Sequence, residues 1–547
     1  MLDGCTPWPQ DVAERYRTEG YWRGETLLDL LDESVRRVGG RTALVGPGTR
    51  LTYDELDRRS RRMAAGFRAR GIRAGDRVVV QLPNTPEFVV VCFALFRLDA
   101  KPVFCLPAHR AAEVRHLCEL SQAVGYVFPA ELNGFDHLGL ARRVRDELPT
   151  LQHLFVYGED TAGVGAVPLA EVDAEPEELP APDPSDVAFF LLSGGTTGLP
   201  KLIPRIHEEY AYQARAASQA SGLGEQDVYL AVLPVEFNFT WGCPGVIGAL
   251  QQGGTVVFAE EPTPDVCFAL IEKEGVTITS VVPSVVQMWL DEAEWLDNDI
   301  SSLRTLQIGS AKLHPEVAAR VEPAFGCRLQ QVFGMAEGLL TFTREGDPQE
   351  TVLTTQGRAI SPADEIRIVG EDDREVPVGE TGELLARGPY TLRGYYRAPE
   401  HNARAFTADG FYRSGDLARL TEDGDLVIEG RIKDVIIRGG DKVPADEVER
   451  HLLTLPAVAR AALVPVPDTY LGEKTCAFVV PQGTPPSLVE LKEALRARGL
   501  AEYKLPDRIE YLGSLPLTGL GKVDKKRLSA IARGEDAPAA ASLPAAG

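Results

Sequence analysis

Hydrophobic residues along the chain form short continuous runs that alternate with longer helical stretches. The runs are rich in branched aliphatic and aromatic residues, as is typical of strands buried on both faces of a sheet. The expected strands lie at 77–82, 102–106, 187–192, 304–309 and 328–334. Between them, residues 87–100 and 264–275 have the length and apolar content of covered helices. This alternation predicts an α/β protein with helices on both faces of parallel sheets.

The pattern changes near residue 424. Residues 423–442, rich in charge and glycine, predict a hairpin-like pair of strands, and we place a domain boundary near 430. The chain is therefore divided into an N-terminal domain, 1–430, and a compact C-terminal domain, 435–536, followed by an Ala/Pro-rich tail, 537–547, that we expect to be disordered. The C-terminal domain is expected to hold helices at 445–455 and 487–500 and strands near 461–466, 474–480 and 508–512.

Charge and apolar content narrow the class of function. A formal net charge of -23 over 547 residues argues against nucleic-acid binding, because phosphate backbones are bound by clustered Lys and Arg. The longest apolar run, Phe88 to Phe96, is too short for a membrane span, and the first ten residues do not resemble a secretory signal. The eight cysteines include no CxxC pair, so neither a zinc site nor a disulfide framework is indicated. We expect a cytoplasmic protein that contacts no membrane.

The segment SGGTTGLPK, residues 193–201, follows the expected strand 187–192. Glycines allow backbone N–H groups to turn toward an anion, threonine hydroxyls add donors, and a lysine supplies a point charge. The spacing differs from a Walker loop, because Leu199 and Pro200 separate the last glycine from the lysine. The segment predicts a phosphate-binding loop made of Ser193, Gly194, Gly195, Thr196, Thr197, Gly198 and Lys201.

With this loop and five further blocks, the chain resembles the adenylate-forming superfamily, which includes acyl-CoA synthetases, luciferases and nonribosomal adenylation domains. The blocks follow in the superfamily's order: FGMAEG (333–338), TGELLARGPYTLRGYY (381–396), YRSGDL (412–417), GRIKDVIIRGG (430–440) and LTGLGK (517–522). Within the superfamily, the chain most resembles the stand-alone aryl-acid adenylating enzymes of siderophore and nonribosomal peptide pathways. These enzymes share Ala336 of FGMAEG, where most members of the superfamily have threonine.

The resemblance implies a fold, two cofactors and a set of roles. The fold would have a large N-terminal domain of doubly wound parallel sheets with a barrel-like part, and a small mobile α+β C-terminal domain. ATP would place its phosphates on the loop 193–201, and Glu337 would bind Mg²⁺, a hard cation that prefers oxygen ligands. The adenine and ribose would contact Gly309, Ser310, Ala311, Val332, Phe333, Gly334, Asp416 and Arg431.

Two lysines of the C-terminal part carry further implied roles. Lys522 would bridge the substrate carboxylate and the α-phosphate, which suits a compact charge on a long stem. Lys433 lies at the expected hinge, 431–434. Rotation there would let one active site perform adenylation and then thioester formation.

The acid pocket is expected in the stretch LPVEFNFTWGCPG, 233–245. Asn238 matches the family's asparagine, whose amide meets the ring hydroxyl next to the carboxylate, and Phe239 would lie beside the ring. Cys243 and Leu340 are typical of salicylate enzymes rather than 2,3-dihydroxybenzoate enzymes. A thiol is a weak donor, so a 3-hydroxyl buried against it would lose a partner at a cost of roughly 1 to 3 kcal/mol. The whole expected pocket is Phe237, Asn238, Phe239, Cys243, Ala311 and Leu340.

Phe237, where many aryl enzymes have histidine, keeps other acids open: 2,3-dihydroxybenzoate, anthranilate, 3-hydroxyanthranilate and 3-hydroxypicolinate. Core filling by Cys243 and Leu340 is the alternative to a role in specificity. No segment resembles a carrier domain, so the thiol would come from a separate aryl carrier protein or from coenzyme A. A light-producing or oxidative relative and a catalytically silent binding protein on the same fold are the remaining alternatives.

Overall fold

The computed structural model describes residues 1–193, 199–295, 297–311, 313, 315–370, 372–431, 435–516 and 523–536. The loop residues 194–198, the hinge residue Lys433, Lys522 and the tail 537–547 lie outside this description, as does the side chain of Arg431. Contacts divide the chain into two units. The first comprises Met1–Pro107, Arg115–Ser193 and Lys201–Gly430, and the second includes Ala108–Val114 and the described residues from Arg431 onward.

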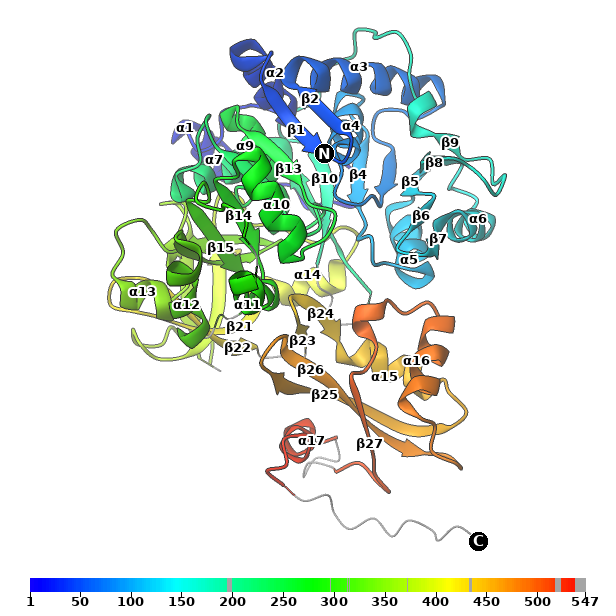
Figure 1. Ribbon diagram of the computed structural model, residues 1–547, viewed down its shortest axis with the longest axis vertical. Helices are drawn as coiled ribbons and strands as arrows, with labels where there is room; N and C mark the ends of the chain where they lie inside the picture. Colours follow the sequence, from blue (N-terminus) through cyan, green and yellow to red (C-terminus); the bar gives the residue numbers. More distant parts are fainter. Residues whose placement is uncertain are drawn as a thin grey trace. The chain divides into compact units, whose positions relative to one another are not determined.

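The largest sheet of the first unit has nine strands in the order β18-β17-β16-β15-β14-β12-β13-β1-β2 (Figure 1). Its strands from β16 to β1 run parallel, whereas β17, β18 and β2 are antiparallel additions. The middle strands are almost wholly buried, which explains their continuous apolar sequence. The strands are β1 (Thr42–Gly46), β2 (Thr49–Thr52), β12 (Val228–Ala231), β13 (Thr255–Phe258), β14 (Ile278–Val281), β15 (Thr305–Gly309), β16 (Arg328–Met335), β17 (Gly338–Phe342) and β18 (Arg358–Ala359).

A second sheet has seven strands in the order β11-β10-β4-β3-β5-β8-β9. All neighbours are parallel except β10 and β11, which form an antiparallel pair around the expected phosphate loop. Together the two sheets confirm the predicted α/β class. The strands are β3 (Arg77–Val80), β4 (Lys101–Phe104), β5 (Gly125–Pro129), β8 (His153–Tyr157), β9 (Val167–Pro168), β10 (Val187–Leu192) and β11 (Leu202–Ile206), with a separate pair β6 (Glu131–Leu132) and β7 (Phe135–Asp136).

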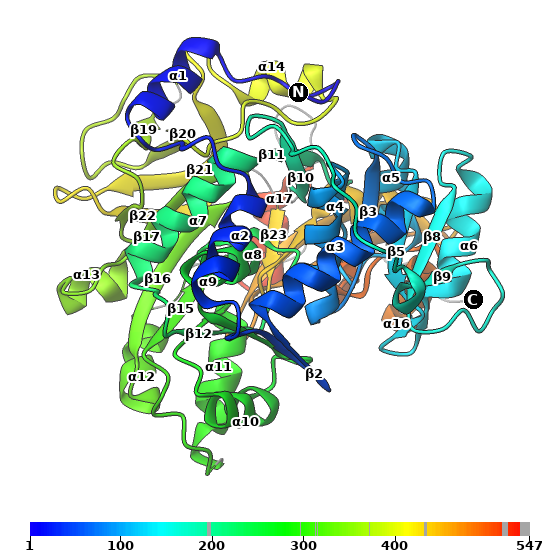
Figure 2. The same cartoon turned by 90° about the horizontal axis from the view of Figure 1, so that it is seen from above.

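Helices cover both sheets, and α3 (Tyr53–Ala69) lies beside α4 (Pro86–Arg97) in Figure 2. Every residue of α4 except Glu87 is buried, so its apolar run is a core helix. Within the described part of the chain, no helix combines the length and hydropathy that crossing a bilayer requires. The other helices before residue 430 are α1 (Gln10–Thr18), α2 (Leu27–Val38), α5 (Ala111–Ser121), α6 (His137–Glu147), α7 (His207–Ser221), α8 (Asn238–Gly242), α9 (Gly245–Gln252), α10 (Pro264–Glu274), α11 (Pro283–Glu292), α12 (Pro315–Phe325), α13 (Gln349–Thr354) and α14 (Pro399–Ala405), with single turns η1 (Leu169–Glu171) and η2 (Ala293–Trp295).

The expected barrel-like part is an antiparallel sheet, ordered β19 (Glu365–Val369), β20 (Gly382–Arg387), β21 (Tyr412–Leu420) and β22 (Leu426–Arg431). The prediction of a hairpin at 423–442 is wrong. β22 pairs within this sheet, whereas the next strand, β23 (Val435–Arg438), pairs with β24 (Asp441–Pro444) and β26 (Gly472–Pro481) of another sheet. Two adjacent strand patterns do not reveal their partners, because pairing depends on residues far away in sequence.

The second unit is α+β. β23, β24 and β26 join β25 (Val458–Asp468) and β27 (Arg508–Tyr511) in a five-stranded sheet. The long antiparallel pair β25 and β26 is buried between two apolar clusters, because its side chains alternate between the faces of the sheet. The helices are α15 (Ala445–Leu453), α16 (Leu488–Ala497) and α17 (Lys525–Ala532), with a single turn η3 (Glu502–Lys504).

Candidate active site

The two ends of the expected phosphate loop are joined by hydrogen bonds. The N–H of Ser193 donates to the carbonyl of Lys201 at 2.9 Å, and the N–H of Lys201 donates to Ser193 Oγ at 3.2 Å. These bonds extend the β10–β11 pairing by one step beyond Leu192 and Leu202. The loop therefore begins and ends at one fixed point, while its residues 194–198 lie outside the described ones.

Glu337 and Lys201 both contact Tyr395, a residue that sequence reasoning did not single out. The Tyr395 hydroxyl donates to Glu337 Oε1 at 2.9 Å, and Lys201 Nζ lies 5.6 Å from the centre of its ring. Burial, followed by the nearby carboxylate, raises the pKa of Tyr395 well above its usual value, which keeps its hydroxyl a donor. Tyr412 lies 2.8 Å from the same hydroxyl. The predicted metal ligand and the predicted phosphate lysine are thus brought together around one tyrosine ring.

The carboxylate of Glu337 fits a hard cation. Its side chain is buried, and the N–H of Leu392 donates to its main-chain carbonyl at 2.7 Å, which holds the backbone in place. Within the described part of the chain, the second carboxylate oxygen, Oε2, has no donor. An oxygen ligand of this kind, with phosphate oxygens nearby, suits Mg²⁺.

The expected nucleotide wall lies at the ends of two neighbouring parallel strands. Gly309 ends β15 and pairs with Val332 of β16, and Phe333 and Gly334 follow on the same strand. A Cβ on Gly309 would lie 2.5 Å from the Val332 carbonyl oxygen and 3.3 Å from Phe239. Only glycine allows this approach, because real Cβ atoms essentially never come so close to a carbonyl. The carboxyl ends of parallel strands are where open α/β sheets bind ligands.

The structure gives fewer contacts for the remaining residues of this wall. Ser310 has a positive φ of 68°, which turns the chain sharply after β15, and half-buried Ala311 follows it. Asp416 is buried on β21, and its N–H donates to Ser414 Oγ at 3.0 Å. The side chain of Arg431 is outside the description, so its expected role at the ribose stays a prediction.

Apart from Ala311, the residues of the expected acid pocket lie on or directly beside α8 and on β17. Asn238 opens α8, its Oδ1 accepts from the Tyr210 hydroxyl at 2.8 Å and from Gln213 Nε2 at 3.1 Å, and its Nδ2 donates to the Met335 carbonyl at 3.2 Å. Phe239 follows and packs toward Gly309. Phe237, the residue directly before α8, is half-buried.

Cys243 and Leu340 are both buried. Burial raises the pKa of the Cys243 thiol, so it stays protonated and is a weak donor. Its Sγ lies 3.9 Å from Gln213 Nε2. The N–H of Leu340 donates to the hydroxyl of Tyr390 at 3.3 Å, which ties the pocket strand β17 to the chain that follows β20. Arg205 connects these two neighbours, because its Nη2 donates to Gln213 Oε1 at 2.8 Å and to the Tyr390 carbonyl at 3.1 Å.

Sequence reasoning missed the buried polar residues behind the pocket: Arg205, Tyr210, Gln213, Tyr390 and Tyr395. A signal was present for two of them. Glu209 and Gln213 are four residues apart near the start of α7, which places them on one side of the helix. Arg205, a charged residue inside the apolar strand β11, was the second signal.

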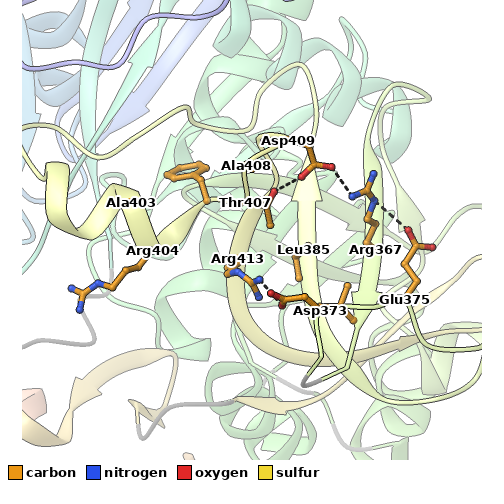
Figure 3. Close-up of a pocket in the computed structure, with 12 residues that line it drawn as sticks. Arg367, Asp373, Glu375, Leu385, Ala403, Arg404, Thr407, Ala408, Asp409 and Arg413 are labelled. Atoms are coloured by element: carbon orange, nitrogen blue, oxygen red, sulfur yellow. Dashed lines mark hydrogen bonds and ion pairs between the residues drawn. The ribbon is translucent and has the colours of Figure 1, made fainter.

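A separate cavity of about 560 Å³ lies on β19, β20 and β21 and beside α14 (Figure 3). Two arginines that line it form ion pairs with carboxylates that also line it: Arg367 with Asp409 at 2.7 Å and Arg413 with Asp373 at 2.5 Å. None of the predicted site residues lines it. This cavity is therefore separate from the candidate site.

Comparison with known proteins agrees with this arrangement. The family model of the AMP-binding enzymes matches residues 31–396, and that of the AMP-binding enzyme C-terminal domain matches residues 447–522. A 2,3-dihydroxybenzoate-AMP ligase of Bacillus subtilis is 53% identical over 96% of this chain and 97% of its own length. A salicyl-AMP ligase / salicyl-S-ArCP synthetase of Mycobacterium tuberculosis is 48% identical over 96% of this chain and 94% of its own length.

Among solved structures, the apo structure of Mycobacterium smegmatis MbtA is similar, with a TM-score of 0.75 and 48% identity over 96% of this chain and 98% of that one. The resemblance to the adenylate-forming superfamily is therefore confirmed, as is the expected fold of a large domain with parallel sheets and a smaller C-terminal domain. On these grounds the chain belongs to the AMP-binding enzyme family.

Proposed function

We propose that this protein is an aryl acid ligase that uses ATP to convert an aryl carboxylic acid, salicylate, into an acyl-AMP. The observation that carries the proposal is the contact at Gly309, which lies between Val332 of the nucleotide wall and Phe239 of the acid pocket. A site that shares one residue between a nucleotide and an acid suits a reaction that joins them. Similarity to two aryl acid-AMP ligases over nearly the whole chain supports the same class of reaction.

In this reaction a carboxylate oxygen bonds to the α-phosphorus of ATP, and the bond from that phosphorus to the β-phosphate bridging oxygen breaks. Pyrophosphate leaves with the electron pair. Such a transfer depends on positioning and on charge stabilisation more than on covalent help from the protein. The loop 193–201 and Lys201 would orient the phosphates, and Lys522 would hold the attacking carboxylate against the α-phosphate. Bound Mg²⁺ at Glu337 would neutralise phosphate charge.

Salicylate is favoured over 2,3-dihydroxybenzoate by the surroundings of Cys243. A 3-hydroxyl directed at this buried thiol would meet only a weak donor and acceptor, and Leu340 fills the space beside it more than valine would. The identity values do not separate the two acids, because relatives of both kinds are about equally similar. The substrate is therefore proposed from the pocket and not from the relatives.

The activated acyl group would pass to a thiol. The thiolate sulfur attacks the acyl carbon, AMP leaves with the electron pair, and a thioester forms. We propose a separate aryl carrier protein with a phosphopantetheine arm as the acceptor, as the name of one relative indicates for that relative, with coenzyme A as the alternative.

The test is ATP–pyrophosphate exchange with salicylate, 2,3-dihydroxybenzoate, anthranilate, 3-hydroxyanthranilate, 3-hydroxypicolinate and benzoate. Salicylate is expected to give the highest kcat/KM for pyrophosphate exchange. Faster exchange with another acid keeps the ligase and overturns the argument from Cys243. No exchange with any acid favours a catalytically silent binding protein on this fold.

A further inference from the structure

The amide of Asn238 is fixed from behind by a network of buried polar side chains. Arg205, Gln213 and Asn238 form this network, and all three are buried. Arg205 Nη2 donates to Gln213 Oε1 at 2.8 Å, and Gln213 Nε2 donates to Asn238 Oδ1 at 3.1 Å. Arg205 is itself held by Glu209 at 2.9 Å and by the carbonyl of Ala336 at 2.8 Å, next to Glu337.

Which atom donates and which accepts in each hydrogen bond of this network follows from Arg205. A guanidinium has donors only, so the atom of Gln213 that faces Arg205 must be its oxygen. The amide nitrogen of Gln213 then faces the carbonyl of Gly242 at 3.0 Å, which has no hydrogen to give and confirms the same orientation. The amide of Gln213 therefore cannot be turned over without losing both bonds.

The orientation of Asn238 follows in turn. Its atom facing Gln213 Nε2 must be an acceptor, Oδ1, and its atom facing the Met335 carbonyl must be a donor, Nδ2. The hydroxyl of Tyr210 donates to the same Oδ1 at 2.8 Å, and burial raises the pKa of Tyr210, so this hydroxyl keeps its hydrogen. Both acceptor positions of Oδ1 are then occupied. Among the described residues, Met335 is the one partner of Nδ2, and the second N–H of that nitrogen remains for a ligand.

We propose that Arg205 and Gln213 are positioning residues that make Asn238 a pure donor, so that the enzyme selects aryl acids with a hydrogen-bond acceptor next to the carboxylate. This inference rests on the proposed function and names the substrate feature that the pocket reads. The acceptor is a ring hydroxyl oxygen or a ring nitrogen. A 2-amino group is rejected, because its hydrogens would face the N–H of Asn238.

The chemistry of two nearly isosteric acids makes the difference large. In salicylate the phenolic hydrogen can bond to the neighbouring carboxylate, which leaves a lone pair of the phenolic oxygen for Asn238. In anthranilate the amino nitrogen shares its lone pair with the ring and offers mainly donors. Two buried donors facing one another leave both unsatisfied. We expect kcat/KM for salicylate to exceed that for anthranilate by roughly ten- to hundredfold, the range that one unsatisfied buried group produces.

The first experiment measures kcat/KM in ATP–pyrophosphate exchange for salicylate, anthranilate and benzoate with the full-length wild-type protein. Salicylate above both others is the expected result. Anthranilate equal to or above salicylate overturns the inference while leaving the ligase intact. An enzyme that exchanges with none of the three, nor with 3-hydroxypicolinate, removes the proposed function and the inference with it.

The second experiment uses two variants that each remove one bond to Asn238 Oδ1. Gln213→Met keeps the side-chain length but removes one of the two groups that set the orientation of the Asn238 amide, the other being the Met335 carbonyl, so the ratio of kcat/KM for salicylate over anthranilate should fall. Tyr210→Phe is the matched control, because a hydroxyl can donate or accept and does not set the sense; its activity should fall with the ratio retained. Melting curves show whether each variant is folded. Equal ratios in the two variants would mean that Gln213 has only a structural role and would overturn the assignment.

Discussion

Asp364 is a carboxyl group that the fold removes from water. The Tyr390 hydroxyl and the N–H of Ser361 both donate to its Oδ2. Its Oδ1 has no partner among the described residues and lies against Gly388, where a Cβ would be only 2.1 Å away. Burial raises the pKa of Asp364 to about 8, and the bond from Tyr390 opposes that rise. The Tyr390 hydroxyl also accepts from the N–H of Leu340, so it connects this carboxyl group to a residue of the expected acid pocket.

Asp364 should make stability depend on pH. Its pKa in the folded protein is about 8, against 3.8 for the free group, so its contribution is fully present below about pH 4 and is lost as pH rises through 8. Each unit of raised pKa corresponds to about 1.4 kcal/mol at full effect. Asp364→Asn cannot ionise, so the melting temperature of the variant minus that of the wild type should rise by several degrees from pH 5 to pH 9. Parallel melting curves for the two proteins across this range would contradict the prediction.

Gly309 has a steric role, unlike the electrostatic role of Asp364. Gly309→Ala would place a Cβ 2.5 Å from the Val332 carbonyl and against Phe239, so strands β15 and β16 must separate at the site. We expect pyrophosphate exchange to fall by about tenfold or more, on the order of the 1 to 3 kcal/mol that overpacking costs, with a raised KM for ATP. Gly40→Ala is the matched control, because nothing lies within 4 Å of that position. Similar activity in both variants would show that the wall tolerates a methyl group.

At the scale of elements, α8 is too short to orient its own side chains. It has five residues, and its buried face is held by α7, whose Tyr210 and Gln213 reach the side chain of Asn238. α7 is long and has buried residues on nearly every side, which is characteristic of a helix enclosed by other elements. The expected acid pocket thus includes a short helix whose Asn238 side chain is held by a longer, buried helix.

Cys243 follows α8, and its substitution tests how this element affects the choice of substrate. Cys243→Ser replaces a weak donor with a hydroxyl that can bond a 3-hydroxyl, so kcat/KM for 2,3-dihydroxybenzoate relative to salicylate should rise by roughly ten- to hundredfold. Exchange rates with the two acids give the ratio. Cys5→Ser, a half-buried thiol outside the pocket stretch, is the control and should leave it unchanged. An unchanged ratio in Cys243→Ser would make this thiol core filling.

At the scale of the whole molecule, the chain consists of two compact units, and the residues assigned to chemistry are distributed between them. The first unit holds Lys201, Glu337, Asn238 and the strand ends that we expect to face the nucleotide. Lys522 belongs to the second unit in sequence. A lysine that is delivered from another unit can act in one half-reaction and leave for the next.

Lys522→Ala should therefore separate the two half-reactions. We expect pyrophosphate exchange to fall by roughly a thousandfold, the loss produced by removing a charge that stabilises a transition state. Thioester formation from supplied acyl-AMP should be largely retained. The matched control is Lys526→Ala, an exposed lysine of α17. Equal loss of both half-reactions in Lys522→Ala would refute the division of labour.

Much of the fold was predictable because its signals are local. The strand at 187–192 and the helix at 264–275 were expected from runs of apolar residues, and β10 (Val187–Leu192) and α10 (Pro264–Glu274) lie there. The failure at 423–442 had a different origin. β22 and β23 are each strand-like in sequence, but their pairing partners lie in different sheets, and no local pattern encodes a distant partner.

The sequence by itself determined most of the elements and the family, because periodicity, glycine placement and motif spacing are properties of short segments. Only the tertiary structure decided how those residues are presented. The donor sense of Asn238 depends on Arg205 and Gln213, and the raised pKa of Asp364 depends on burial by segments far from it in sequence. Hydrogen-bond direction and desolvation are set by what surrounds a group in space, so they appear only once the chain is folded.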